Sequence, residues 1–72
     1  MKELIELYDR TYRNCMFYKE NGKREHLLNE ICVLRGIVYC IEAASEEKNA
    51  FVYVDFEKFS LMIEEQNRLL GK

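Results

Sequence analysis

Residues 31–44, ICVLRGIVYCIEAA, are the stretch that decides the fold of this chain. Eleven of these positions are apolar, and at helical spacing they surround most of a helix instead of lining one stripe. A surface helix of a small domain has a single apolar face. The stretch therefore predicts a helix that is covered on several sides.

Breaker residues divide the rest of the chain around this helix. Asn21-Gly22 predicts the end of a first helix spanning about residues 2–20, because glycine accepts the left-handed conformation that ends helices. The second helix is predicted over about residues 24–47. The third should begin near Asp55, a suitable N-cap, and stop at Gly71. The prediction is an all-α fold in one domain, residues 1–72, with a helical hairpin and a C-terminal helix forming a small three-helix bundle.

Apolar residues at helical spacing give candidate core faces. In the first helix these are Met1, Leu4, Ile5, Tyr8, Tyr12, Cys15 and Met16; in the second, Leu27, Ile31, Leu34, Val38 and Ile41; in the third, Phe56, Phe59, Ile63 and Leu70. Residues 51–54, FVYV, are strand-like by propensity, but they have no evident partner strand. We interpret them as an extended linker or an early start of the third helix, with a short strand as the alternative.

A ridge of small side chains runs along the second helix beside its aliphatic face. Gly36 costs about 1 kcal/mol relative to alanine in a helix interior, so close approach of another helix is a physical reason for it. The candidate oligomer interface consists of Cys32, Gly36, Ile37, Cys40 and Ala43. A monomeric bundle with a central second helix is one alternative. We expect a homo-oligomer, for which a two-fold dimer is the commonest symmetry.

Composition bounds the class of protein. A chain of 72 residues buries only about 60% of its unfolded surface, so oligomerisation is a natural aid to stability. Cys15, Cys32 and Cys40 form no CxxC motif and indicate free thiols in a reducing, cytoplasmic compartment. With one histidine, no zinc spacing is visible, and we expect no metal or cofactor. The N-terminus lacks a signal-peptide pattern, and residues 31–44 are too short to span a bilayer, so we expect no membrane association.

Residues 8–24, YDRTYRNCMFYKENGKR, combine arginines with aromatic rings and are the best functional lead. Aromatic and arginine side chains are enriched at binding hot spots, and arginines also suit phosphate groups. The candidate partner or ligand surface is Tyr8, Arg10, Tyr12, Arg13 and Phe17. Because no catalytic motif is present, we expect no enzymatic activity.

These features predict a small non-enzymatic helical interaction protein that binds or blocks another macromolecule. Its predicted partners are further copies of this chain and a different protein. In its size and its lack of catalytic motifs and export signals, the chain resembles many small proteins of bacteria, phages and mobile elements, although no sequence motif supports that resemblance. One alternative is an oligomeric protein that sequesters an anionic nucleotide. A second alternative is a nucleic-acid-binding regulator, which the net charge of −2 and the lack of a helix-turn-helix pattern disfavour.

Overall fold

The computed structural model describes residues 1–71, which form α-helices and one 3₁₀ turn and contain no strand. The elements are α1 (Lys2–Glu20), α2 (Arg24–Ala44), the turn η1 (Ala50–Val52) and α3 (Phe56–Leu69). The predicted all-helical, three-helix fold is confirmed. Within these residues no helix has the length and apolar character needed to cross a membrane.

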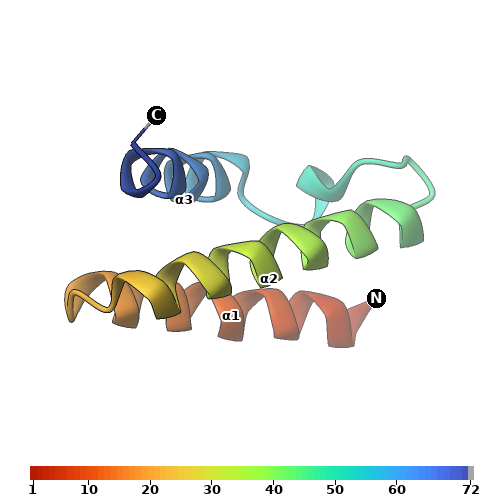
Figure 1. Cartoon of the computed structure of the whole chain (residues 1–72). Coiled ribbons are helices and arrows are strands. Elements are labelled where there is room, and N and C mark those ends of the chain that lie inside the picture. Colours follow the sequence, from red (N-terminus) through yellow and green to blue (C-terminus); the bar gives the residue numbers. More distant parts are fainter. Residues whose placement is uncertain (72) are drawn as a thin grey trace.

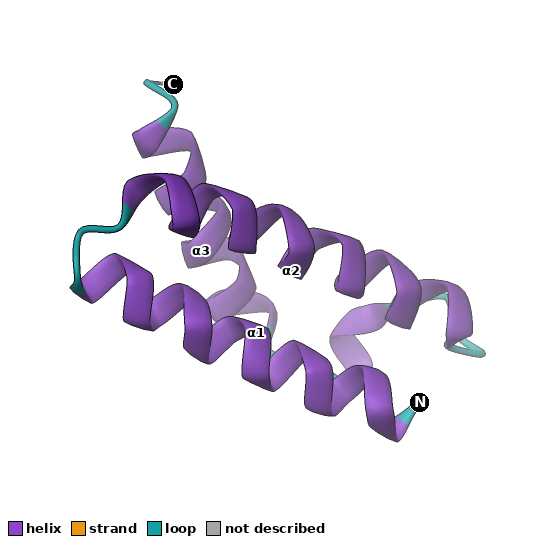
Figure 2. Cartoon of the chain, turned by 60° about the horizontal axis from the view of Figure 1, so that its bottom comes forward, coloured by secondary structure: helices purple, strands orange, loops and turns teal. Residues whose placement is uncertain are grey.

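The helices are arranged as a hairpin with a crossing third helix. In Figure 1, α1 and α2 run across the page side by side in opposite directions, whereas α3 is seen almost end-on above α2. Figure 2 shows the same crossing from another side, with α3 behind the α1–α2 pair. Because α3 crosses the hairpin, it covers only part of the length of α2.

The turn between α1 and α2 follows its sequence signal. Asn21 ends α1, and its side-chain Nδ2 donates a hydrogen bond to the Phe17 carbonyl oxygen at 2.8 Å. Gly22 has φ +65°, a conformation that glycine adopts without steric cost. The predicted helix stop is therefore confirmed, and it sets the antiparallel hairpin.

The core is built mainly on α2. Its five predicted aliphatic residues are all buried, from 0% exposed for Ile31, Leu34 and Ile41 to 7% for Val38. The remaining buried residues are Ile37 of α2 itself, Tyr8, Thr11 and Cys15 of α1, Ala50 of η1, Met62 and Gln66 of α3, and Ser45 and Val54 between elements. Gln66 accepts a hydrogen bond from Arg35 Nη1 at 3.0 Å, which ties α3 to α2.

Three predicted core residues are exposed instead. Phe56 is 58% exposed, Leu70 49% and Met1 38%. Each lies at an end of α1 or α3, or just beyond it, where a side chain has fewer neighbours than in the middle of a helix. Helical spacing identifies the face on which a residue lies, but it does not show how far the neighbouring helix extends. Phe56 is only partly sheltered, by the edge of the Phe51 ring with centroids 4.8 Å apart.

The segment between α2 and α3 differs from prediction. α2 ends at Ala44, three residues before the expected end, because Ser45 turns to an extended conformation (ψ 138°) and is 1% exposed. Residues 51–54 are neither an extended linker nor an early start of α3. Phe51 and Val52 belong to the 3₁₀ turn η1, where the side chain of Asn49 accepts the Phe51 backbone N–H at 3.0 Å, and Tyr53 and Val54 follow as a turn and a bend. The predicted N-cap Asp55 is confirmed, since its side chain accepts from the Lys58 backbone N–H at 3.1 Å.

Candidate functional site

One side of α2 is largely uncovered by the rest of the chain; only its edges are contacted, where Gln66 Nε2 donates to Cys32 Sγ at 3.5 Å and Lys48 Nζ donates to the Ala43 carbonyl oxygen at 3.0 Å. We define the open face of α2 as its exposed residues Cys32, Val33, Gly36, Tyr39, Cys40 and Ala43. Val33 is 47% exposed and Tyr39 67%. A Cβ atom added at Gly36 would meet no other part of the chain within 4 Å. Gly36 is therefore not a close helix contact within this chain.

The open face contains four of the five predicted interface residues. Ile37, the fifth, does not lie on this face, because it is 6% exposed and belongs to the core. At about 100° per residue, the open face and the neighbouring Asn29 cover a sector of roughly 120° around α2. No charged residue lies in this sector between positions 29 and 43, whereas the exposed side of α1 carries charges such as Glu6, Asp9 and Arg13.

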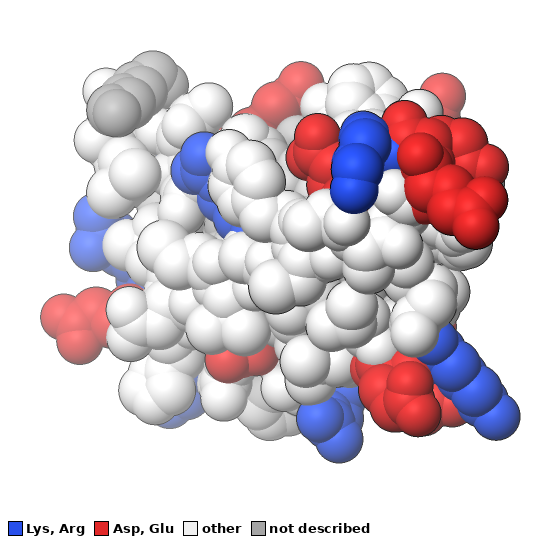
Figure 3. All heavy atoms as spheres, turned by 90° about the vertical axis from the view of Figure 1, so that its right-hand side faces the viewer, with Lys and Arg blue, Asp and Glu red and all other residues white. Residues whose placement is uncertain are grey.

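A second uncharged area lies at the end of the molecule where α1 begins and α2 ends. Figure 3 shows this end, with uncharged atoms across the middle and most charged side chains toward the rim. Phe51 is 37% exposed, Val52 57% and Tyr53 40%. No site was predicted in this segment; its run of aromatic and β-branched residues predicts only local structure.

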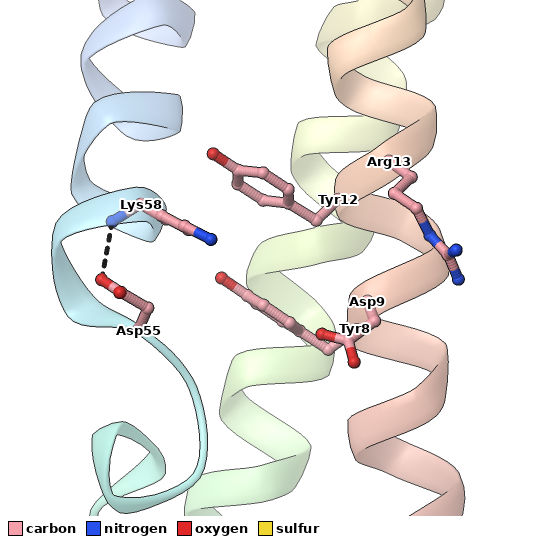
Figure 4. A pocket seen from close by; sticks show the side chains of 6 residues that line it. All are labelled: Tyr8, Asp9, Tyr12, Arg13, Asp55 and Lys58. Atoms are coloured by element: carbon pink, nitrogen blue, oxygen red, sulfur yellow. Dashed lines mark hydrogen bonds between the residues drawn. The ribbon is translucent and has the colours of Figure 1, made fainter.

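Three predicted ligand-surface residues meet at a hollow between α1 and the start of α3. Tyr8, Tyr12 and Arg13 line this hollow of about 380 Å³, together with Asp9, Asp55 and Lys58. Tyr8 and Tyr12 lie one turn apart on α1, with ring centroids 6.2 Å apart and ring planes inclined by 23°. In Figure 4 both hydroxyl groups point from α1 toward the start of α3.

The other two predicted surface residues lie outside this hollow. Phe17 is 59% exposed, and its ring meets only the edge of Tyr18, with centroids 5.7 Å apart. Arg10 is exposed on α1 and does not line the hollow. The predicted surface is thus divided between a hollow and an outward side. Sequence reasoning missed Lys58 and gave Asp55 only a capping role, because the crossing of α3 over the hairpin brings both residues to α1.

The hollow favours neutral tyrosine hydroxyls. Burial, followed by the charges of Tyr12, Asp55, Asp9 and Cys15, raises the pKa of Tyr8 to about 12. Burial also raises the pKa of Tyr12, with smaller contributions from Cys15 and Asp55. Both phenols therefore remain protonated near neutral pH and can donate hydrogen bonds.

A second hollow, of about 270 Å³, lies at the hairpin turn and has a basic lining. Lys19, Lys23, Arg24 and Arg68 line it beside a single acidic residue, Glu65. Arg24 Nη2 donates to the Leu69 carbonyl oxygen at 2.7 Å, which holds the end of α3 against the start of α2. Glu65 is paired with Arg68 and lies 3.9 Å from Lys19 Nζ, so it is largely neutralised.

Among residues 1–71, no group of three or more His, Cys, Asp or Glu side chains is placed to hold a metal ion. In comparisons with known proteins, no family model, no curated protein and no solved structure matches the chain. The function is therefore inferred from the residues and geometry of this chain alone.

Proposed function

We propose that the protein is a small non-enzymatic helical interaction protein that self-associates through the open face of α2 and acts by binding or blocking a macromolecule. The observation that carries this proposal is an exposed helix face without charge over four turns. The solvent side of a helix in a monomer ordinarily carries polar and charged residues. A second copy of the chain would cover this face and remove its apolar groups from water.

The order of residues on the open face favours an antiparallel pair of α2 helices. Gly36 lies at its middle, and positions equally far before and after Gly36 would face one another across a two-fold axis. Cys32 would then lie opposite Cys40 of the second copy, and Asn29 opposite Ala43. Without side chains at Gly36, the two helix backbones can approach closely at the centre of the pair.

Sedimentation at micromolar concentration, followed by mild oxidation, tests the proposal. We expect a dimer whose two chains become linked through Cys32 and Cys40, both exposed thiols. These two cysteines lie roughly 12 Å apart along one helix, too far to bridge within a chain. A covalent dimer on a non-reducing gel therefore reports contact between two copies.

Two single variants determine the direction of the helices. In the antiparallel pair, Cys32→Ser and Cys40→Ser should each abolish the crosslink, because the remaining thiols lie about 12 Å apart along the pair. In a parallel pair, either variant would still crosslink like to like. A chain that sediments as a monomer and yields no covalent dimer would contradict self-association itself.

The basic hollow favours a second candidate function, capture of an anionic ligand such as a nucleotide. Clustered basic side chains attract phosphate groups, and here they act on an otherwise acidic chain. A panel of nucleotides should raise the melting temperature of the wild type by mass action, and Lys23→Gln should reduce that shift. No shift across the panel would exclude this candidate.

A further inference from the structure

The hollow between α1 and α3 contains a buried hydroxyl group without a partner. Tyr8 is 5% exposed, and its hydroxyl has no hydrogen-bond partner among residues 1–71. Buried polar groups in proteins nearly always have a hydrogen-bond partner, because a buried group without one has lost its bonds to water and gained none in return. The hydroxyl also points into the hollow, as Figure 4 shows. The hydroxyl itself has less than 1 Å² of exposed surface, so a molecule in the hollow supplies the missing partner by displacing a lining side chain such as that of the exposed Lys58.

Two more polar groups enter the hollow from opposite walls. Figure 4 shows the hydroxyl of Tyr12 extending from α1 and the ammonium of Lys58 extending from α3 toward it. Within residues 1–71 the Lys58 ammonium forms no ion pair, while the backbone N–H of Lys58 is bound by Asp55. Two phenols and an ammonium are all hydrogen-bond donors, which is the set that a carboxylate requires.

The charges around the hollow are balanced. Lys58 supplies a cation and Asp55 an anion at the start of α3; Asp9 and Arg13 add one charge of each sign from α1, and the Arg13 guanidinium is directed away from Lys58 (Figure 4). Asp55 uses Oδ1 for its cap, and its Oδ2 has no partner among the described residues. A dianion such as a phosphate monoester would meet two carboxylates here. A ligand with one positive and one negative group would find a partner for each.

We propose that this hollow binds a small zwitterion of the α-amino acid class. The ligand carboxylate lies at the Lys58 ammonium and the two tyrosine hydroxyls, and the ligand ammonium lies at the Asp55 carboxylate. A volume of about 380 Å³ is at the lower end of small-molecule sites, which suits a ligand of this size. The site is on α1 and α3, away from the open face of α2, so it does not depend on the proposed self-association.

Calorimetric titration with each of the twenty common L-amino acids tests the proposal. We expect at least one to bind at millimolar concentration or below. The matched comparison for that amino acid uses its carboxylic acid without the amino group and its amine without the carboxylate. For leucine, these are 4-methylpentanoate and 3-methylbutylamine. Each analogue should bind at least tenfold more weakly, because it leaves one charged group of the site without a partner.

Variants assign the binding to this hollow. Tyr8→Phe removes a single oxygen atom and should weaken binding about tenfold or more, since it removes a hydrogen bond to a charged group. Lys58→Gln, a change at an exposed residue, should also weaken binding, which keeps the test valid if the Tyr8 variant folds poorly. Tyr18→Phe is the matched control, because Tyr18 lies on α1 outside this hollow.

Three results would overturn the proposal. The first is no binding by any amino acid, which would leave water as the partner of Tyr8. The second is equal binding of an amino acid and its carboxylic acid. The third is binding that Tyr8→Phe and Lys58→Gln leave unchanged. None of these outcomes affects the crosslinking test of the α2 pair.

Discussion

At the residue scale, Tyr8 and Cys15 should make the free energy of unfolding depend on pH in the alkaline range. Burial and the negative charges nearby raise the pKa of Tyr8 from 10.0 to about 12, and burial followed by Glu30 raises the pKa of Cys15 from 9.0 to about 12. Well below pH 9 both groups are neutral in the folded and the unfolded chain. Above it the unfolded chain loses protons first, so the free energy of unfolding should fall as pH rises toward about 12.

Urea denaturation at a series of pH values checks this expectation. Tyr8→Phe should reduce the slope of stability against pH by about one proton between pH 10 and about 12. Cys15→Ala should flatten the decline that begins at pH 9, while lowering stability at every pH by leaving a cavity. If neither variant changes the slope, these two groups do not govern the alkaline decline.

The three thiols should differ in reactivity. Cys15 is buried, and burial also disfavours its reactive thiolate form, whereas Cys32 and Cys40 are exposed. A colorimetric thiol reagent should therefore label two thiols quickly and the third only after unfolding. Labelling of the two exposed thiols should slow as protein concentration rises, because the proposed α2 pair covers them. Rapid labelling of all three in the folded chain would contradict the core assigned to α1.

At the element scale, the start of α3 depends on one side chain. The Asp55 carboxylate accepts the Lys58 backbone N–H at 3.1 Å, which satisfies one of the unpaired donors of the first turn. Asp55→Ala should lower the free energy of unfolding by about 0.5–2 kcal/mol, and Asp55→Asn should recover most of that loss because asparagine caps as well as aspartate. Urea denaturation at neutral pH measures both. Equal losses in the two variants would assign the effect to charge instead of capping.

At the scale of the whole molecule, the sequence predicts elements better than their arrangement. The aliphatic face of α2, the Gly22 turn and the Asp55 cap were all predicted, because each depends on residues within one or two turns. The crossing of α3 was not predicted, since it depends on packing between segments more than thirty residues apart, such as Arg35 with Gln66. The same crossing explains why Phe56 is exposed and why Lys58 joins Tyr8 at one hollow.

Substitutions at Gly36 should affect the stability of the single chain and the stability of the dimer in opposite directions. In the single chain a Cβ atom at this position meets nothing within 4 Å, so Gly36→Ala should stabilise the monomer by up to about 1 kcal/mol through helix propensity alone. In the α2 pair the same methyl group would enter the closest point between two backbones. It should therefore weaken dimerisation, and Gly36→Leu should weaken it further through overpacking.

The two effects have opposite signs, and protein concentration separates them. Thermal unfolding at low concentration, where monomers dominate, should show a higher melting temperature for Gly36→Ala than for the wild type. Sedimentation at high concentration should show a larger dissociation constant for the same variant. Ala43→Gly, a change at the edge of the open face, is the matched control, because it lowers helix propensity without adding volume at the centre. A Gly36→Leu chain that dimerises like the wild type would show that the closest contact lies elsewhere.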